Sequence, residues 1–253
     1  MITRRLQMLR LAGLAALALL AAGPALAADT QVAVAANFTE PAREIAAAFK
    51  ADTGHTAILS FGSSGQFYNQ IARGAPYEVF LSADADRPRR AEQDGVGVPK
   101  TRFTYAIGRI VLYSRTPGLV DQGGGVLKAG KFAKLAIADP AAAPYGAAAI
   151  QTMRKLGVYD RMKPKLVMGA NITQTYQFVA TGAAEVGFVA LSQVIMDQGG
   201  SRWVVPAADH TPIDQQAILL YPGLNSAAAK AFMTYLKSPK ATRIIKRYGY
   251  EVR

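Results

Sequence analysis

The stretch QVAVAANFTEPAREIAAAFKA, residues 31–51, decides the fold, because an apolar run leads through a short polar turn into an amphipathic segment. The run 31–36 predicts a buried strand, and the segment 40–51 predicts a helix with one apolar face. Pro41 suits the first turn of this helix, and Gly54 suits its end. A buried strand followed by a helix is the repeating unit of an α/β protein.

The same order of strand and helix recurs along the rest of the chain. Further strands are predicted at 55–61, 78–82, 109–114, 135–138, 165–168, 185–189, 203–205 and 216–221, and further helices at 65–73, 84–93, 146–156, 173–181, 191–198, 226–236 and 239–248. The glycine-rich stretch 117–130 between them is predicted to be a loop. Two series of strand-helix units indicate two α/β lobes with parallel strands, and a ligand has a natural place between them.

The first 27 residues are predicted to be a secretory signal peptide. Three arginines precede an apolar run from Leu11 to Gly23, and Ala25-Leu26-Ala27 fits the small-x-small cleavage pattern. The apolar run is too short to span a membrane comfortably, and no second long run follows it. The mature protein is therefore predicted to be exported and soluble.

Composition excludes several classes of site. The chain has no cysteine, which removes disulfides, thiol catalysis and cysteine-based metal sites, and it has only two histidines. The formal charge of +12 falls to +9 once the three arginines of the signal are removed. A basic surface fits an anionic ligand or is simply solvated, whereas an exported protein rarely meets nucleic acid.

Four of the predicted strand-to-helix turns consist of small or polar residues and contain no charge. They are residues 35–39 (AANFT), 61–65 (FGSSG), 144–146 (PYG) and 169–173 (GANIT). The start of a helix leaves backbone N–H groups without internal partners, and the aligned peptide dipoles favour negative charge there. These turns could therefore bind an anion without lysine or arginine.

Individual residues in these turns also have ordinary structural roles. Asn37, Ser63 and Ser64 could donate side-chain hydrogen bonds to a ligand, or they could cap helices. Tyr145 could simply be a half-buried aromatic residue, and Ile172 a core residue or hydrophobic staple. Composition alone leaves both interpretations open.

The chain resembles the periplasmic molybdate-binding proteins of ABC transporters over nearly all of its mature length. The motifs that carry the resemblance are residues 32–39, 60–65, 74–76, 79–84, 138–140, 144–146, 155–157, 187–189 and 246–249. The resemblance implies an α/β fold of the two-lobed periplasmic binding protein type II class, with a ligand cleft between lobes that two crossover strands join. The implied division is lobe 1 at 28–107 plus 213–253 and lobe 2 at 108–212.

The resemblance also implies the ligand and its residues. The ligand is molybdate, with tungstate as a second one, and no cofactor or other metal is expected. The implied oxyanion-binding residues are Asn37, Ser64, Tyr145 and Ile172, with Ala36 and Ser63 beside them. Asn37 and Ser64 take the polar positions of the first lobe, whereas Tyr145 and Ile172 donate backbone N–H groups from the second.

Two positions depart from the pattern of many family members. Many have serine where Asn37 stands, and many have a ligand-touching tyrosine where this chain has Ala190. We expect Asn37 to compensate for the hydroxyl that is missing at Ala190. The implied partners are a membrane permease and its cytoplasmic ATPase, and the mature periplasmic protein is expected to be a monomer.

The same residues are compatible with alternative functions. The string Gly62-Ser63-Ser64-Gly65 is not the Gly-x-Ser-x-Gly of a serine hydrolase, and only His55 and His210 could supply a base, so no enzyme is expected. A second alternative is the binding of another oxyanion such as sulfate, and a third is an interaction-only protein.

A carboxylate or phosphonate would usually need a fixed arginine clamp. The four turns contain no arginine, and Arg73, Arg87 and Arg109 are interpreted as surface residues. The sequence therefore favours an inorganic oxyanion over these organic acids.

Overall fold

The first predicted unit forms where the apolar run and the amphipathic segment predict it. In the computed structural model, which describes residues 27–252, β1 (Asp29–Ala35) is followed by a short 3-10 turn η2 (Ala36–Phe38) and α2 (Thr39–Thr53). Gly54 ends α2 at a φ of 78°, a backbone conformation that favours glycine. Apart from Ala27, the predicted signal peptide lies outside the described residues.

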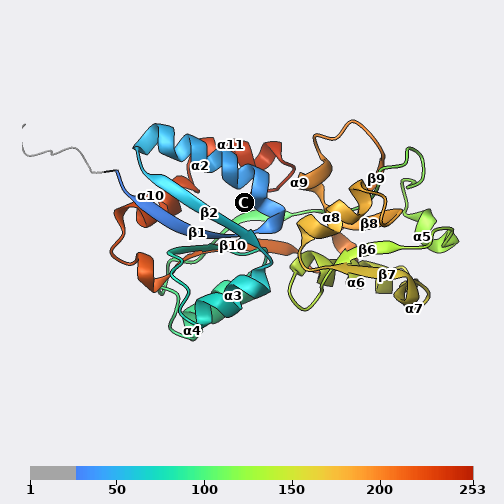
Figure 1. Cartoon of the computed structure of the whole chain (residues 1–253), viewed down its shortest axis with the longest axis horizontal. Helices are drawn as coiled ribbons and strands as arrows, with labels where there is room; N and C mark the ends of the chain where they lie inside the picture. The colour runs from blue at the N-terminus through green and yellow to red at the C-terminus, as the bar shows by residue number, and fades with distance from the viewer. Residues whose placement is uncertain (1–26, 253) are drawn as a thin grey trace, which may run out of the picture.

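The first sheet has the strand order β2-β1-β3-β10-β4. Its other strands are β2 (Thr56–Gly62), β3 (Val79–Leu81), β4 (Phe103–Gly108) and β10 (Ile213–Leu219). Its helices are α3 (Ser64–Ala72), α4 (Asp86–Gln93), α10 (Ala227–Tyr235) and α11 (Pro239–Arg247), with η5 (Tyr221–Gly223) before α10. Figure 1 shows α2 and α11 on one side of this sheet and α3 and α4 on the other.

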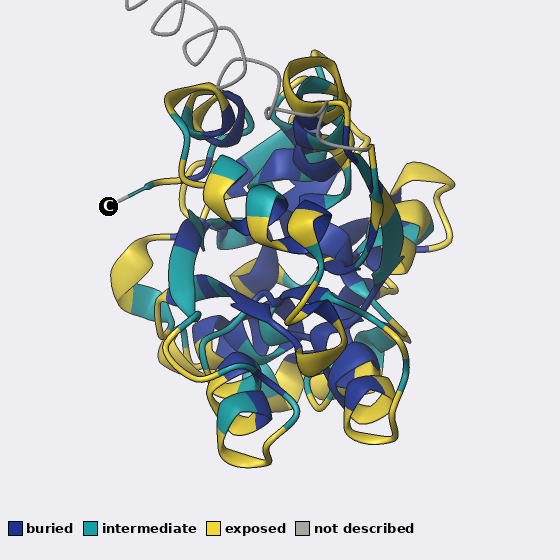
Figure 2. Cartoon of the chain, turned by 90° about the vertical axis from the view of Figure 1, so that its left-hand side faces the viewer, coloured by how far each residue is buried: buried dark blue, intermediate teal, exposed yellow. Residues whose placement is uncertain are grey.

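Alternation along β1 explains the two layers of helices. Val32 and Val34 belong to the core cluster under α2, α10 and α11, whereas Ala33 belongs to the cluster that contains Phe67 and Ile71 of α3. Successive side chains of a strand point to opposite faces, so a wholly apolar strand needs cover on both faces. Figure 2 shows this arrangement as buried strands and inner helix faces beneath an exposed outer surface.

The second sheet has the strand order β7-β6-β8-β5-β9. Its strands are β5 (Ile110–Ser114), β6 (Leu135–Ala138), β7 (Leu166–Gly169), β8 (Val186–Ala190) and β9 (Ser201–Val204). Its helices are α5 (Gly125–Ala129), α6 (Pro144–Lys155), α7 (Tyr159–Met162), α8 (Ile172–Ala180) and α9 (Leu191–Val194), with 3-10 turns η3 (Lys163–Lys165) and η4 (Ala207–Asp209). We call each sheet with its helices a lobe.

The chain crosses between the lobes twice, from β4 to β5 at Arg109 and from β9 back to β10. The prediction of parallel strands is right for β1 with β2 and β3, and for β6 with β7 and β8. It is wrong for β10 and β5, which run antiparallel to their neighbours. These two strands follow the crossovers, so each enters its sheet from the opposite end.

Four short elements differ from the sequence prediction, and one of them is α7 (Tyr159–Met162), where no helix was predicted. Strand β4 was not predicted, and α5 lies inside the predicted loop 117–130. Helix α9 ends at Val194, although a helix was predicted to Gln198. A helix of four or five residues spans little more than one turn, so α5, α7 and α9 show no repeated apolar position. No helix within residues 27–252 is long and apolar enough to cross a membrane.

Candidate functional site

All four predicted turns meet at one small cavity between the lobes. The cavity is lined by Ala35, Ala36, Asn37, Gly62, Ser63, Ser64, Ala83, Ala143, Tyr145, Asn171 and Ile172, so all six predicted site residues lie on its wall. The centre of a water molecule can occupy about 10 Å³ of it. The lobes therefore leave only a small space between them at this point.

Ser64 is the first residue of α3 and is 1% exposed. Its hydroxyl oxygen accepts a hydrogen bond from the backbone N–H of Ala83 at 2.9 Å. A serine hydroxyl has one proton to donate besides its lone pairs. Because Ala83 occupies a lone pair, the Ser64 proton is left to donate to a group in the cavity.

Ser63 caps the start of α3. Its hydroxyl accepts from the backbone N–H of Gln66 at 3.3 Å, and the Gln66 side chain accepts from the backbone N–H of Ser63 at 3.4 Å. This reciprocal pair is a capping box. The cap fixes the start of α3 and so positions Ser64.

In the second lobe, the two predicted site residues are buried and lie at helix starts. Tyr145 and Ile172 are 2% and 3% exposed, and both belong to the hydrophobic core cluster of this lobe. Each lies in the first turn of its helix, α6 or α8, where backbone N–H groups lack intrahelical partners. Asn171 caps α8 by accepting from the backbone N–H of Gln174 at 3.0 Å.

A glycine sets how closely α6 approaches β6. A Cβ at Gly146 would lie 2.0 Å from the carbonyl oxygen of Ala138, the last residue of β6. Only glycine permits this approach. The Pro-Tyr-Gly sequence therefore starts α6 with Pro144 and holds the Tyr145 backbone at the cavity.

Asn37 has its side-chain donors engaged within the protein. Its Nδ2 donates to Gln215 Oε1 at 2.8 Å and to the Tyr250 hydroxyl at 2.9 Å, and the residue is 3% exposed. A side-chain amide has two N–H donors, and both have partners in this orientation. Compensation for Ala190 by the Asn37 side chain stays a prediction.

Asn37 is part of a buried polar network that joins the lobes. Tyr105 and Tyr145 contact Gln215, at 3.0 and 3.2 Å, while the hydroxyls of Tyr250 and Ser192 donate to the Asn37 carbonyl at 2.7 and 2.8 Å. Burial holds the pKa of the Tyr105 and Tyr145 hydroxyls well above the usual tyrosine value and raises the pKa of Tyr250 to about 12. These hydroxyls therefore stay protonated at neutral pH.

Sequence reasoning missed four members of this network: Tyr105, Ser192, Gln215 and Tyr250. A single polar residue in a strand, such as Gln215, carries no local signal of its partner. Asn37 and Tyr250 are 213 residues apart in the chain, so only the fold brings them together.

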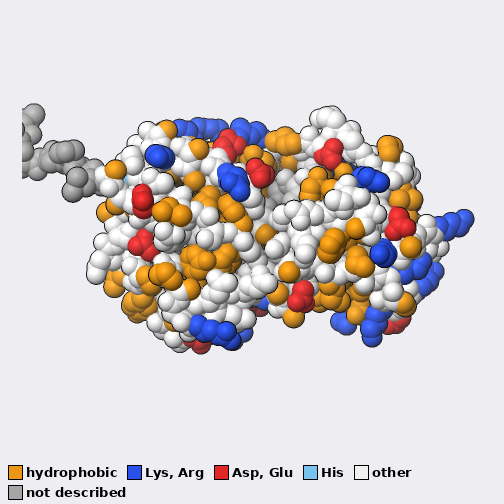
Figure 3. Space-filling model, viewed as in Figure 1, with side chains coloured by type: hydrophobic (Ala, Val, Ile, Leu, Met, Phe, Trp, Pro, Cys, Tyr) orange, Lys and Arg blue, Asp and Glu red, His pale blue; other side chains and the backbone are white. Residues whose placement is uncertain are grey.

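The cavity is uncharged. None of the lining residues, all within the described chain, has a charged side chain. Residues 27–252 also contain no group of three His, Cys, Asp or Glu side chains that could hold a metal ion. On the face in Figure 3, lysines and arginines are scattered over both lobes, so the basic charge is not concentrated at one site there.

Two of the three arginines interpreted as surface residues have structural contacts. Arg87 is partly buried, pairs with Asp84 and reaches the carbonyl oxygen of Ala141 in the other lobe at 2.9 Å. Arg109 pairs with Glu251 at 2.9 Å. Both side chains are partly exposed and neither lines the cavity, but pairing to a distant carbonyl or carboxylate leaves no mark in the local sequence. Arg73 is exposed, as predicted.

The family of bacterial extracellular solute-binding proteins matches this chain over residues 30–251. The chain belongs to this family. The two-lobed solute-binding fold that the sequence predicts is thereby confirmed.

Individual relatives and a solved structure agree with this membership. The chain is 57% identical over 241 residues to the molybdate-binding protein ModA of Rhodobacter capsulatus, covering 94% of this chain and 95% of the relative. It is 56% identical over 227 residues to the molybdate-binding protein ModA of Azotobacter vinelandii, covering 88% and 90%. The solved structure of the Azotobacter vinelandii periplasmic molybdate-binding protein matches with a TM-score of 0.86 at 41% identity, covering 88% of this chain and 99% of that one.

Proposed function

We propose that this protein captures molybdate in the periplasm and delivers it to the permease and ATPase of an ABC transporter. One observation carries the proposal: helix starts from both lobes converge, without any charged side chain, on one small cavity. The proposed ligand residues are Asn37, Ser64, Tyr145 and Ile172, with Ala36 and Ser63 beside them. The names of the relatives at 57% and 56% identity support molybdate as the ligand.

The chemistry of the wall favours a fully deprotonated dianion. Backbone N–H groups of helix starts and the Ser64 hydroxyl are donors, and helix dipoles favour negative charge at the same points. Hydrogen phosphate would bring a proton that needs an acceptor, and one unmatched buried group costs about 1–3 kcal/mol. Sulfate brings no such proton, so the size of the cavity must discriminate against it. Tungstate, a tetrahedral dianion like molybdate, is proposed as a second ligand.

The relatives also argue against an enzyme. Molybdate-binding transport proteins bind a solute and release it, and we assign the same role to this chain. The two candidate bases of a hydrolase are engaged elsewhere: His55 Nδ1 accepts from the backbone N–H of Ala28 at 3.2 Å, and a ring nitrogen of His210 contacts the Thr211 carbonyl at 2.8 Å. Neither histidine lines the cavity that contains Ser64.

Further parts of the proposal concern the whole protein. We propose that residues 1–27 direct export and are removed, that the lobes comprise 28–107 plus 213–253 and 108–212, and that the mature protein is a monomer. Mass spectrometry of the protein purified from the periplasm, followed by light scattering, tests the cleavage site and the monomer. A retained leader or a dimer would contradict these parts alone.

Calorimetry of the mature protein tests the ligand. We expect tight binding of molybdate and tungstate, much weaker binding of sulfate and none of phosphate. The control variant His210→Ala should bind like the wild type, because His210 lies outside the cavity. Absence of heat with molybdate, or equal affinity for sulfate, would overturn the proposed function.

A further inference from the structure

The lobes meet at η2, where the Asn37 carbonyl accepts from the Ser192 hydroxyl at 2.8 Å and the Ala36 carbonyl accepts from the Thr173 hydroxyl at 3.4 Å. They also meet in two further groups of contacts, and the first of these lies at the crossovers. A Cβ at Gly108, the last residue before the first crossover, would come within 2.3 Å of the Tyr145 hydroxyl. Gln215, near the start of β10, donates to the same hydroxyl at 3.2 Å. Residues beside a hinge move least when two lobes separate, so this group persists when the cleft opens.

The second group joins α3 and α4 of the first lobe to the segment before α6 in the second. The backbone N–H of Gly65 donates to the carbonyl of Ala142 at 2.9 Å, and Nη2 of Arg87 donates to the carbonyl of Ala141 at 2.9 Å. Neither side of these contacts belongs to a crossover strand. Opening of the cleft therefore separates these atoms.

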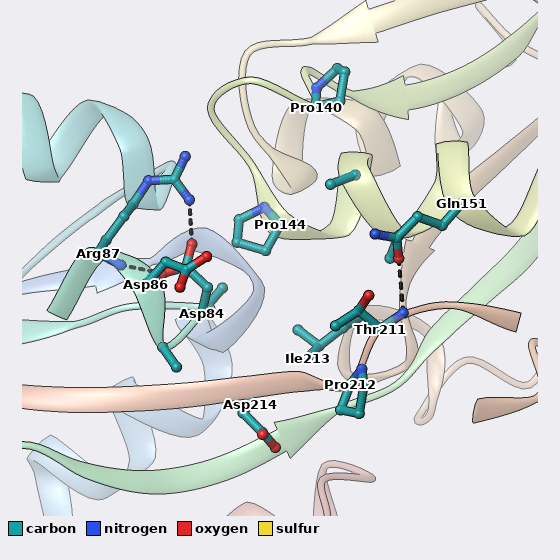
Figure 4. A pocket seen from close by; sticks show the side chains of 14 residues that line it. Asp84, Asp86, Arg87, Pro140, Pro144, Gln151, Thr211, Pro212, Ile213 and Asp214 are labelled. Carbon is teal, nitrogen blue, oxygen red and sulfur yellow. Dashed lines mark hydrogen bonds and ion pairs between the residues drawn. The ribbon is translucent and has the colours of Figure 1, made fainter. Parts of the chain in front are cut away.

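Arg87 is held in position for this contact by Asp84. The Asp84 carboxylate accepts from the backbone N–H of Arg87 at 2.9 Å, pairs with the guanidinium, and is itself fixed by the Ser82 hydroxyl at 3.1 Å. Figure 4 shows Arg87 and Asp84 together, facing Pro140 and Pro144 of the other lobe. The guanidinium is thus oriented before the lobes meet.

The Arg87 contact lies next to the Gly65–Ala142 hydrogen bond, since a Cβ at Gly65 would come within 3.0 Å of both Arg87 Nη2 and the Ala142 backbone. A cavity of about 450 Å³ lies beside it, with Asp86 and Arg87 on one wall and Pro144 and Gln151 on another (Figure 4). The side chains of Arg87 and Asp84 are both 18% exposed, so solvent screens their charges only in part. A hydrogen bond from a charged donor in such a setting is stronger than one between neutral groups.

The same turns supply this contact and the ligand groups. Gly65 follows Ser64, and the carbonyls of Ala141 and Ala142 precede Tyr145 in the turn that leads into α6. We propose that Arg87, without touching the oxyanion, determines how long the lobes stay closed over it by bridging to Ala141. This inference rests on the proposed function of the cavity between the lobes.

A contact that exists only in the closed state should change the rate of ligand release. It lowers the free energy of the closed form for every ligand equally, so it slows release without changing the preference among oxyanions. Loss of a hydrogen bond to a charged group, discounted for partial exposure, should speed release about tenfold.

Arg87→Gln and Arg89→Gln form a matched pair for the test. Both arginines lie on α4 and both pair with an aspartate three residues earlier, but Arg89 pairs with Asp86 at 2.7 Å and has 55% of its side chain exposed. The release of radiolabelled molybdate into an excess of unlabelled molybdate gives the dissociation rate. Titrations with molybdate and tungstate give the affinities, and thermal unfolding without ligand gives the stability.

We expect Arg87→Gln to raise the dissociation rate and both Kd values about tenfold, with an unchanged association rate and molybdate-to-tungstate ratio. Arg89→Gln should match the wild type in binding, and both variants should unfold at the same temperature without ligand. Equal release rates for the two variants would overturn the inference, as would a tenfold change confined to one oxyanion. A wild type that binds no molybdate would instead overturn the proposed function.

Discussion

The walls that the two lobes contribute to the cavity present hydrogen-bond donors in different ways. The first wall consists of small residues at strand ends. The Ser64 hydroxyl lies in this wall, and its oxygen accepts a hydrogen bond from the backbone N–H of Ala83. The second wall contains two large residues, Tyr145 and Ile172, whose side chains belong to the core, and we propose that it acts through their backbone N–H groups. The proposed donors of the first wall therefore depend on the Ser64 side chain, whereas those of the second wall depend on where α6 and α8 begin.

Displacement of a helix in the second wall should have the largest effect. Gly146→Ala places a Cβ 2.0 Å from the Ala138 carbonyl, so α6 must shift and carry the Tyr145 backbone with it. We expect molybdate binding to be lost and the free energy of unfolding to fall by about 1–3 kcal/mol, as measured by calorimetry and denaturant unfolding. The control Gly123→Ala, where the nearest atom to the new Cβ is 3.8 Å away, should change neither; tight binding by Gly146→Ala would contradict the role of α6.

Removal of a hydroxyl from the first wall should have the second-largest effect on molybdate binding. Ser64→Ala loses a donor to the dianion and leaves the buried N–H of Ala83 without its acceptor, so we expect Kd for molybdate to rise about 100-fold. Ser63→Ala removes a helix cap and should instead lower the free energy of unfolding by about 1 kcal/mol, with a smaller change in Kd. The ranking fails if titration finds the larger loss of affinity in Ser63→Ala.

A single backbone donor can be removed from the second wall with a smaller effect. Ile172 is the first residue of α8, where proline is accepted, and Asn171 before it has the extended conformation that precedes proline. Ile172→Pro should raise Kd about tenfold or more because one hydrogen bond to a charged ligand is lost, whereas Ile172→Val keeps the N–H and should bind like the wild type. If both variants bind equally well, the backbone N–H of Ile172 is not a ligand group.

Change of pH should have the smallest effect. Burial raises the pKa of Tyr250 to about 12 and holds that of Tyr145 higher than normal, so the network behind both walls keeps its protons between pH 6.5 and about 9. We expect Kd for molybdate to stay constant over this range in calorimetric titrations. At higher pH the free energy of unfolding should fall. Tyrosines of the unfolded chain lose their protons near pH 10, whereas the buried tyrosines of the folded protein keep theirs, so the folded state loses stability as pH rises from about 10 to 12. A Kd that changes severalfold below pH 9 would point to a titrating group in the wall.

The difference between the walls also explains what the sequence could predict. Asn37, Ser63 and Ser64 are visible because a polar residue between a strand and a helix is a local pattern. Tyr145 and Ile172 look like core residues, which they also are, so only the family resemblance indicated a role for their backbone. Local patterns report side chains, and the use of a main-chain group is set by packing such as that of Gly146 against Ala138.

Sheet order and long-range partners lay beyond local patterns. The alternation of strands and helices predicted an α/β fold, but the antiparallel direction of β5 and β10 depends on where the chain crosses between lobes. The contacts of Arg87 with Ala141 and of Arg109 with Glu251 span 54 and 142 residues. Partners at such separations are chosen by the assembled fold.

The crossover topology has a consequence for the order of folding. All five strands of the second sheet lie in one continuous stretch, Ile110–Val204, whereas β10 must insert between β3 and β4 to complete the first sheet. Strand β4 sits at the edge with β10 as its neighbour, so the first sheet stays unfinished until the C-terminal segment is in place. Contacts between distant segments form slowly, and the second lobe should therefore be protected from proteolysis before the first during refolding.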